Sequence, residues 1–121
     1  NPLESLIKAG EFAGVKVEID GKLPDDNRAS QIFILASAEA LTNAVRHAGA
    51  ENLYVKFYEE DDLLCAEFTN DGNVPEGKIT EGGGLGSLRS KIESSGGEML
   101  TESSPQYKLI VTVNKERGEW D

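Results

Sequence analysis

The sequence is poor in cysteine and in long apolar runs, and each shortage excludes a class of protein. A single cysteine, Cys65, rules out an internal disulfide and a cysteine-based metal cluster, and it favours a reducing compartment. No stretch approaches the roughly 18 consecutive apolar residues that cross a bilayer. No basic start followed by an apolar segment marks a signal peptide. We therefore expect a cytoplasmic domain without direct membrane contact.

Basic residues are also scarce relative to acidic ones. The 121 residues include 22 Asp and Glu against 12 Lys and Arg, which gives a formal net charge of −10. A field of this sign repels nucleic acids and anionic lipids, so neither is an expected partner. Polyphosphates should be repelled as well, unless local dipoles or a metal ion attract them.

Length and patterning indicate one domain over residues 1–121, with a core at about 15–114 and a polar tail at 115–121. A chain of this size buries roughly two-thirds of its unfolded surface. The only methionine is Met99 and the chain begins with Asn1. We expect a piece excised from a longer protein, monomeric on its own.

Apolar periodicity predicts an alternation of helices and strands. Helices are predicted over 3–13 with a break at Gly10, over about 27–48, and over 85–95. Strands are predicted over 15–19, 52–58, 63–69, 98–102 and 106–114. This order lacks the regular rhythm of a doubly wound sheet. The predicted fold class is an α/β (α+β) two-layer sandwich, with a mixed, mainly antiparallel sheet and helices on one face.

The long predicted helix carries the first candidate functional cluster. On a wheel of about 100° per residue, the predicted buried stripe consists of Ile34, Ala38, Leu41, Val45 and Ala48. The opposite arc gathers four polar side chains, Glu39, Asn43, Arg46 and His47. An ordinary solvent-exposed helix face is the alternative that this helix alone leaves open.

These four residue types suit a nucleotide bound with Mg²⁺. Asn43 offers a neutral oxygen ligand for Mg²⁺, and Glu39, one turn earlier, can orient or deprotonate a water or hydroxyl. Arg46 offers a guanidinium fork for phosphate. His47 offers a flat ring that can face a nucleobase, although a histidine near a helix C-terminus is also common for structural reasons.

Two glycine-containing segments follow. Asn70-Asp71-Gly72 ends a predicted strand, where an ordinary turn is the alternative. The run Gly82-Gly83-Gly84-Leu85-Gly86-Ser87 stands directly before a helix, where backbone N–H groups attract anions. It has neither Walker nor dinucleotide-binding spacing. A flexible linker is its alternative.

In order and spacing, these three segments resemble the nucleotide-binding motifs of the GHKL ATPases. Residues 39–48 are similar to the N box, 70–72 to the G1 box, and 82–89 to the G2 box. The Glu-x-x-Thr-Asn-x-x-Arg-His pattern most resembles the catalytic, ATP-binding domain of NarX- and DesK-like bacterial sensor histidine kinases. The resemblance covers about 15–114 and implies a Bergerat α/β sandwich.

The resemblance also implies roles. Asn43 would bind Mg²⁺ between the phosphates of ATP, Glu39 would be the acid/base or water-orienting carboxylate, and 73–81 would form the ATP lid. The other implied nucleotide contacts are Arg46, His47, Asn70, Asp71, Gly72, Gly82, Gly84, Leu85, Gly86 and Ser87. The implied reaction is transfer of the γ-phosphoryl group of ATP to a histidine.

The sequence departs from the family pattern in three respects. Asn70 stands where an Asp usually reads adenine, and 105–107 reads Pro-Gln-Tyr where a Gly-Thr pair near adenine is usual. The only histidine, His47, lies in the N box. The phosphoacceptor and dimerisation domain is therefore expected upstream of Asn1, with a response regulator as a further partner. The isolated domain should not autophosphorylate.

Two alternatives stay open at this point. One is an anti-sigma-type serine/threonine kinase of the same fold, which needs no acceptor helix. The other is a degenerate Bergerat domain that acts only as a docking module, as the departures at Asn70 and Tyr107 suggest.

Overall fold

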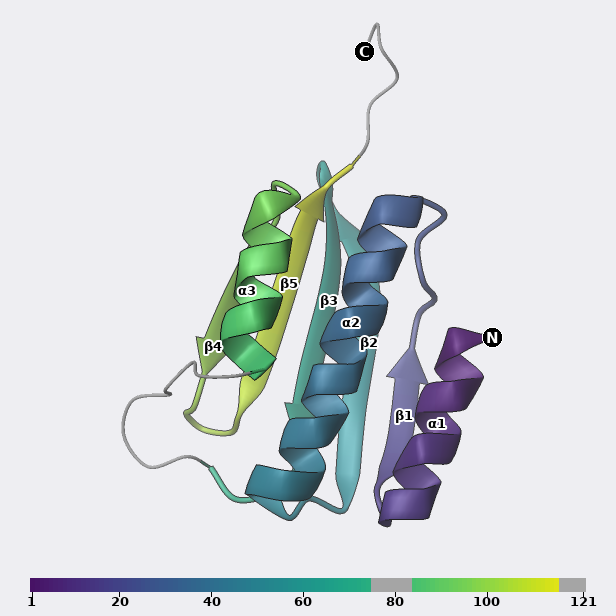
Figure 1. Cartoon of the computed structure of the whole chain (residues 1–121), viewed down its shortest axis with the longest axis vertical. Coiled ribbons are helices and arrows are strands. Elements are labelled where there is room, and N and C mark those ends of the chain that lie inside the picture. Colours follow the sequence, from purple (N-terminus) through teal and green to yellow (C-terminus); the bar gives the residue numbers. More distant parts are fainter. Residues whose placement is uncertain (75–83, 116–121) are drawn as a thin grey trace, which may run out of the picture.

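The computed structural model describes residues 1–74 and 84–115, which fold into two layers (Figure 1). The sheet layer contains the strands β1 (Lys16–Asp20), β2 (Asn52–Glu60), β3 (Leu63–Asn70), β4 (Glu98–Glu102) and β5 (Lys108–Asn114). The helical layer contains α1 (Pro2–Ala13), α2 (Asn27–Asn43) with its π-helical continuation η1 (Ala44–Ala48), and α3 (Gly84–Ser94). Gly82, most of the predicted lid (75–81) and most of the polar tail (116–121) lie outside the described residues.

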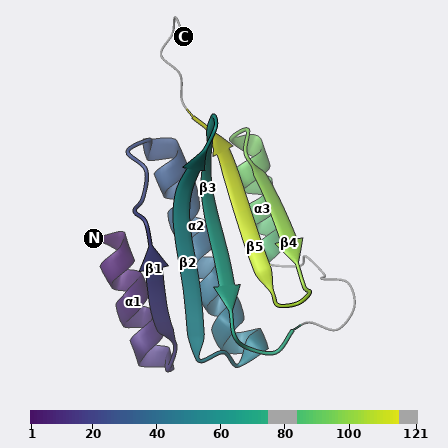
Figure 2. The same cartoon turned by 180° about the vertical axis from the view of Figure 1, so that it is seen from behind.

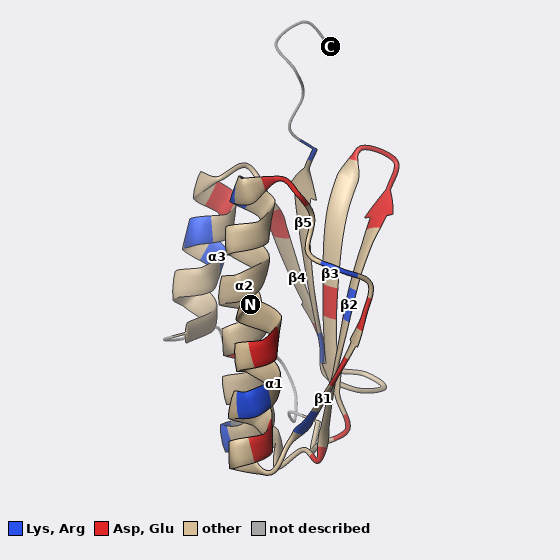
Figure 3. Cartoon of the chain, turned by 90° about the vertical axis from the view of Figure 1, so that its right-hand side faces the viewer, with Lys and Arg blue, Asp and Glu red and all other residues tan. Residues whose placement is uncertain are grey.

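The sheet is mixed and mainly antiparallel, as predicted. Its strand order is β1-β2-β3-β5-β4, with β1 parallel to β2 and the other neighbours antiparallel. The helices lie on one face of the sheet (Figure 3), and Figure 2 shows the opposite face. In the part of the chain that the structure describes, no helix is both long and apolar enough to span a bilayer.

Capping and packing residues determine the helix boundaries. Asp26 begins α2 by accepting a hydrogen bond from the first turn at 3.0 Å, and Gly49 ends η1 with a left-handed φ of 59°. The predicted break at Gly10 is wrong, because α1 runs through it. A Cβ atom on Gly10 would lie 2.6 Å from the carbonyl oxygen of Val15 and 2.7 Å from Cγ2 of Val17. Glycine is therefore there because α1 packs directly onto the start of β1.

The face of α2 that packs on the sheet differs from the predicted stripe. Of the five predicted residues two are buried, whereas Ala38 and Val45 are exposed. The buried residues of α2 are Ala29, Ile32, Phe33, Ala36, Ser37, Ala40 and Leu41. Because the first half of α2 is apolar on both sides, periodicity alone did not select the correct face. Four of the seven buried residues are alanine or serine, and these small side chains let the helix pack closely against the strands.

Arg28 connects both layers at the end of the sandwich where α2 begins. Its guanidinium donates to the carbonyl oxygen of Ser95, just after α3, at 3.0 Å. It also donates to the carbonyl oxygen of Asn114, at the end of β5, at 2.9 Å. These bonds hold α2, α3 and β5 together at this end, whereas the candidate site lies at the other.

Gly10→Ala should lower the free energy of unfolding by about 1–3 kcal/mol, because the new methyl group overlaps backbone atoms. The expected sign opposes the intrinsic effect, since alanine favours a helix over glycine by about 1 kcal/mol. Urea unfolding followed by circular dichroism measures the change, with Lys8→Ala at an exposed position of α1 as the matched control. Unchanged or increased stability of Gly10→Ala would contradict the close packing of α1 on β1.

Candidate functional site

The three segments predicted to bind nucleotide meet at one end of the sandwich. They are the end of α2 with η1, the end of β3 and the start of α3, which lie at the lower end of Figure 1. The topology produces this arrangement, because α2 and β3 both end there and α3 begins there. Residues far apart in the sequence are thereby brought together.

A close backbone contact joins the end of β3 to η1. The N–H group of Asn73 donates to the carbonyl oxygen of Ala48 at 2.8 Å. Gly72 permits this contact, because a Cβ atom there would lie 2.6 Å from the Cβ atom of Ala48 and would overlap its carbonyl oxygen. The predicted glycine of the turn thus has a steric cause, and it fixes the segment 70–72 against the π-helical turn.

Glu39 lies against the first residue of α3. Its carboxylate occupies the space that a Cβ atom of Gly84 would fill. Glu39 and Asn43 are one turn apart on α2, and both are half-buried at the border of the sheet-facing side, not opposite to it as the wheel predicted. The N–H groups at a helix start carry partial positive charge. In this structure, the anion beside them is the protein's own carboxylate.

Tyr107 is a site residue to which sequence reasoning assigned no role. It precedes β5 and is 6% exposed, and its hydroxyl oxygen accepts a hydrogen bond from Nδ2 of Asn43 at 3.3 Å. Because the amide nitrogen donates to Tyr107, the Oδ1 atom of Asn43 remains as an acceptor or metal ligand. The signal in the sequence was the departure at 105–107, where a bulky ring replaces an expected small residue.

Asn70, the last residue of β3, is 2% exposed. Its Oδ1 atom accepts a hydrogen bond from the backbone N–H of Gly72 at 2.9 Å, which closes the turn. The pairing of Thr69 with Lys108 makes Asn70 and Tyr107 neighbours across β3 and β5. The two departures from the expected base-binding pattern therefore lie side by side.

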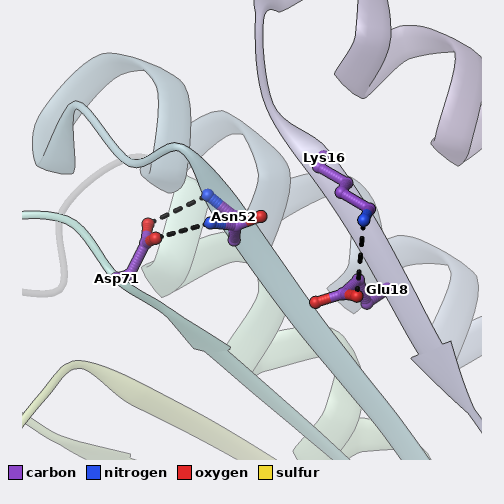
Figure 4. A network of polar contacts seen from close by, with 4 residues as sticks. All are labelled: Lys16, Glu18, Asn52 and Asp71. Atoms are coloured by element: carbon purple, nitrogen blue, oxygen red, sulfur yellow. Dashed lines mark hydrogen bonds and ion pairs between the residues drawn. The ribbon is translucent and has the colours of Figure 1, made fainter.

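The carboxylate of Asp71 is engaged by the start of β2 (Figure 4). Its Oδ1 accepts from the backbone N–H groups of Glu51 and Asn52, both at 2.9 Å, and its Oδ2 accepts from Nδ2 of Asn52 at 2.7 Å. The hydrogen bond from the Asn52 side chain, followed by those from the backbone, holds the pKa of Asp71 below its usual range. Asp71 therefore joins β2 to the end of β3, and its contact with nucleotide stays a prediction.

The remaining predicted residues belong to η1 and to the first turn of α3. Arg46 is exposed on η1, and the backbone of His47 belongs to the same turn. Leu85 is 8% exposed and packs in the core, so its backbone N–H is the group it can offer to a ligand. Gly86 and Ser87 complete the first turn of α3, where the N–H groups of an α-helix have no acceptor inside the helix.

The donors at the site fit Mg²⁺ bound together with a nucleotide. Within residues 1–74 and 84–115, no group of three or more His, Cys, Asp or Glu side chains could hold a metal ion alone. Asn43 Oδ1 and the carboxylate of Glu39 are oxygen donors of the kind that Mg²⁺ accepts when phosphate oxygens and waters complete its shell.

Asp71→Asn should destabilise the domain at neutral pH and lose this effect in acid. Folding lowers the pKa of the Asp71 carboxyl group. Its contribution to stability is therefore complete above the unfolded pKa of about 3.9 and disappears as the pH falls through the lower folded value. Thermal unfolding of wild type and variant between neutral and strongly acidic pH checks this, with Asp25→Asn, at an exposed position, as the control. A difference that persists in acid contradicts the assignment.

Sequence comparison relates the chain to sensor histidine kinases, although no known family model matches it. It is 28% identical over 120 residues to the sensor histidine kinase YxjM of Bacillus subtilis, covering 90% of this chain and 29% of YxjM. It is 26% identical over 76 residues to the signal transduction histidine-protein kinase/phosphatase UhpB of Salmonella typhimurium, covering 62% of this chain and 15% of UhpB. The chain thus spans less than a third of the length of either relative.

Solved structures share the fold. The ATP-binding domain of PrrB from Mycobacterium tuberculosis matches with a TM-score of 0.72 at 19% identity, covering 96% of this chain and 93% of that one. The histidine kinase AdeS of Acinetobacter baumannii matches with a TM-score of 0.71 at 20% identity, covering 96% and 64%. In sequence the chain is similar to sensor histidine kinases, and in fold it matches the ATP-binding domain of PrrB.

Proposed function

We propose that this domain binds ATP together with Mg²⁺ and transfers the γ-phosphoryl group to a histidine of a separate dimerisation domain. The observation that carries the proposal is the meeting of Glu39, Asn43 and the start of α3 at one end of the sandwich. The relatives named as sensor histidine kinases favour this reaction over serine/threonine phosphorylation and over a docking role without catalysis.

The start of α3 and the carboxylate of Glu39 have opposite electrostatic effects on a bound phosphate group. The N–H groups of α3 attract a phosphate group, whereas the carboxylate beside Gly84 repels it. Asn43, one turn from Glu39, offers a neutral oxygen that would hold a divalent cation here, and the positive charge of that cation would offset the conflict. Bound Mg²⁺ would supply charge neutralisation to the phosphates. Local contacts thereby let a domain with a net charge of −10 bind a polyphosphate.

The other residues of the site receive proposed tasks on the same basis. Glu39 orients or deprotonates the attacking group, and Arg46, exposed on η1, contacts phosphate. His47 lines the nucleotide pocket, and Asn70 with its turn meets the base. The backbone N–H groups proposed to bind phosphate are those of Gly82, Gly84, Leu85, Gly86 and Ser87. Catalysis then rests on positioning and electrostatics.

The proposed partners follow from the histidine kinase relationship. The chain covers 29% of YxjM and 15% of UhpB, so the parent protein is proposed to carry the dimerisation domain with the phosphoacceptor histidine. A response regulator is the proposed recipient of the phosphoryl group. The proposed location of the domain is the cytoplasm, where ATP is available.

Calorimetric titration with ADP tests the proposal. With Mg²⁺ present, we expect a dissociation constant from about 1 µM to 1 mM, which corresponds to about 4–8 kcal/mol. EDTA should remove most of the binding, and moderate salt should weaken it less. Asn43→Ala should weaken Mg²⁺-dependent binding about tenfold or more. Asn114→Ala, at an exposed position at the end of β5, is the control that should leave binding unchanged. No binding at millimolar Mg-ADP, or no effect of Asn43→Ala, contradicts the proposal.

Tyr107→Phe should weaken Mg-ADP binding about three- to tenfold without unfolding the domain. The variant keeps the buried ring and removes the hydroxyl group that holds Asn43. Because Asn43 is proposed to act through the metal, the difference from wild type should vanish for the residual binding in EDTA. Tyr54→Phe, with a side chain 40% exposed on the opposite face of the sheet, is the matched control. An equal loss with and without Mg²⁺ would show that the hydroxyl does not orient the metal ligand.

A further inference from the structure

We infer that the nucleotide site accepts a 6-oxopurine base, as in IDP or GDP, at least as well as adenine. This inference rests on the proposed nucleotide site and concerns which base that site reads. The observation behind it is the hydrogen bond between Asn70 and its own turn, because that bond determines which amide atom remains for a ligand.

The orientation of the Asn70 amide follows from its partner. A backbone N–H group can only donate, so the atom 2.9 Å from the nitrogen of Gly72 is the carbonyl oxygen Oδ1. Within residues 1–74 and 84–115, the amide nitrogen Nδ2 has no hydrogen-bond partner. In that part of the chain, every side-chain polar atom that is fully cut off from solvent has a partner. Nδ2 therefore keeps some contact with solvent, so that a ligand seated beside Asn70 can reach it.

The chemistry at C6 of the base distinguishes the two purines at this position. Adenine carries an amino group there, which donates, whereas a 6-oxopurine carries a carbonyl oxygen, which accepts. An Asp at position 70 would keep the bond to Gly72 with one oxygen and present a second oxygen, which suits the adenine amino group. Asn70 presents Nδ2 instead, which can only donate and suits the 6-oxo group.

Because Asn70 is buried, the hydrogen-bond match between Nδ2 and the group at C6 of the base affects the affinity. Asn70 is 2% exposed, and a base bound beside it would exclude the little water that reaches Nδ2, so that two donors facing each other would have no acceptor. Adenine avoids the mismatch by shifting until a ring nitrogen, N1 or N7, accepts from Nδ2. A 6-oxopurine needs no such shift, because its carbonyl oxygen accepts directly. The site should therefore bind both bases, with the 6-oxopurine equal or favoured.

Titration of wild type and Asn70→Asp with Mg-ADP and Mg-IDP tests the inference. IDP is the appropriate probe because it lacks the 2-amino group of guanine and so resembles ADP in shape. We expect the ratio of dissociation constants, IDP over ADP, to be one or less for wild type. Asn70→Asp should raise the ratio about tenfold or more, since a carboxylate oxygen then faces the carbonyl oxygen of the base.

Asn114→Asp is the matched control, because it makes the same amide-to-carboxylate change at an exposed position at the other end of the sheet. It should leave the ratio of the IDP and ADP dissociation constants unchanged. Thermal unfolding checks that Asn70→Asp is folded, and the wild-type ratio decides by itself if it is not. A wild-type preference for ADP, or a smaller shift in folded Asn70→Asp, overturns the inference and leaves the proposed function intact. If neither nucleotide binds, the proposed function fails and the inference fails with it.

Discussion

The close packing of α2 on the sheet is the constraint on which the site depends. Four alanines of α2 and η1, at positions 29, 36, 40 and 44, are at most 1% exposed, so the helix lies near the strands along its whole length. Its end therefore reaches the turn after β3, where Gly72 meets Ala48. A larger side chain at either contact would separate the helix from the turn and divide the site. The small residues of α2, η1 and the turn after β3 thus determine where the polar residues of the site lie.

The two ends of the sandwich are stabilised differently. At one end, Arg28 donates to carbonyl oxygens of two other elements, so protein groups satisfy one another. At the other end, the carboxylate of Glu39 lies beside the start of α3, and Nδ2 of Asn70 has no partner among the described residues. The site end also has internal hydrogen bonds, as at Asp71, but the Glu39 carboxylate and Nδ2 of Asn70 are left there as groups that a ligand can meet.

Much of the fold could be predicted from the sequence, because strand alternation, caps and glycine stops are local signals. The bounds predicted for the long helix, about 27–48, are confirmed, with Asp26 capping its start and Gly49 following its end. The buried face of α2 was predicted wrongly, since both of its sides are apolar and the choice depends on the sheet. Asn43 and Tyr107, which share a hydrogen bond, are 64 positions apart, so the periodicity of the sequence could not reveal their contact. Likewise, only the folded chain shows that the Asp71 carboxylate accepts hydrogen bonds from the backbone at the start of β2.

The π-helical turn makes the number of residues in the site as important as their identity. The N–H of Gly49 bonds five positions back, to the carbonyl oxygen of Ala44, where an α-helix would bond four back. Deleting one residue from 44–48 would leave an ordinary helix end. It would also turn that end by about 100° and carry Ala48 away from Gly72. Exchanging a side chain in this turn should therefore disturb the site less than changing the turn's length.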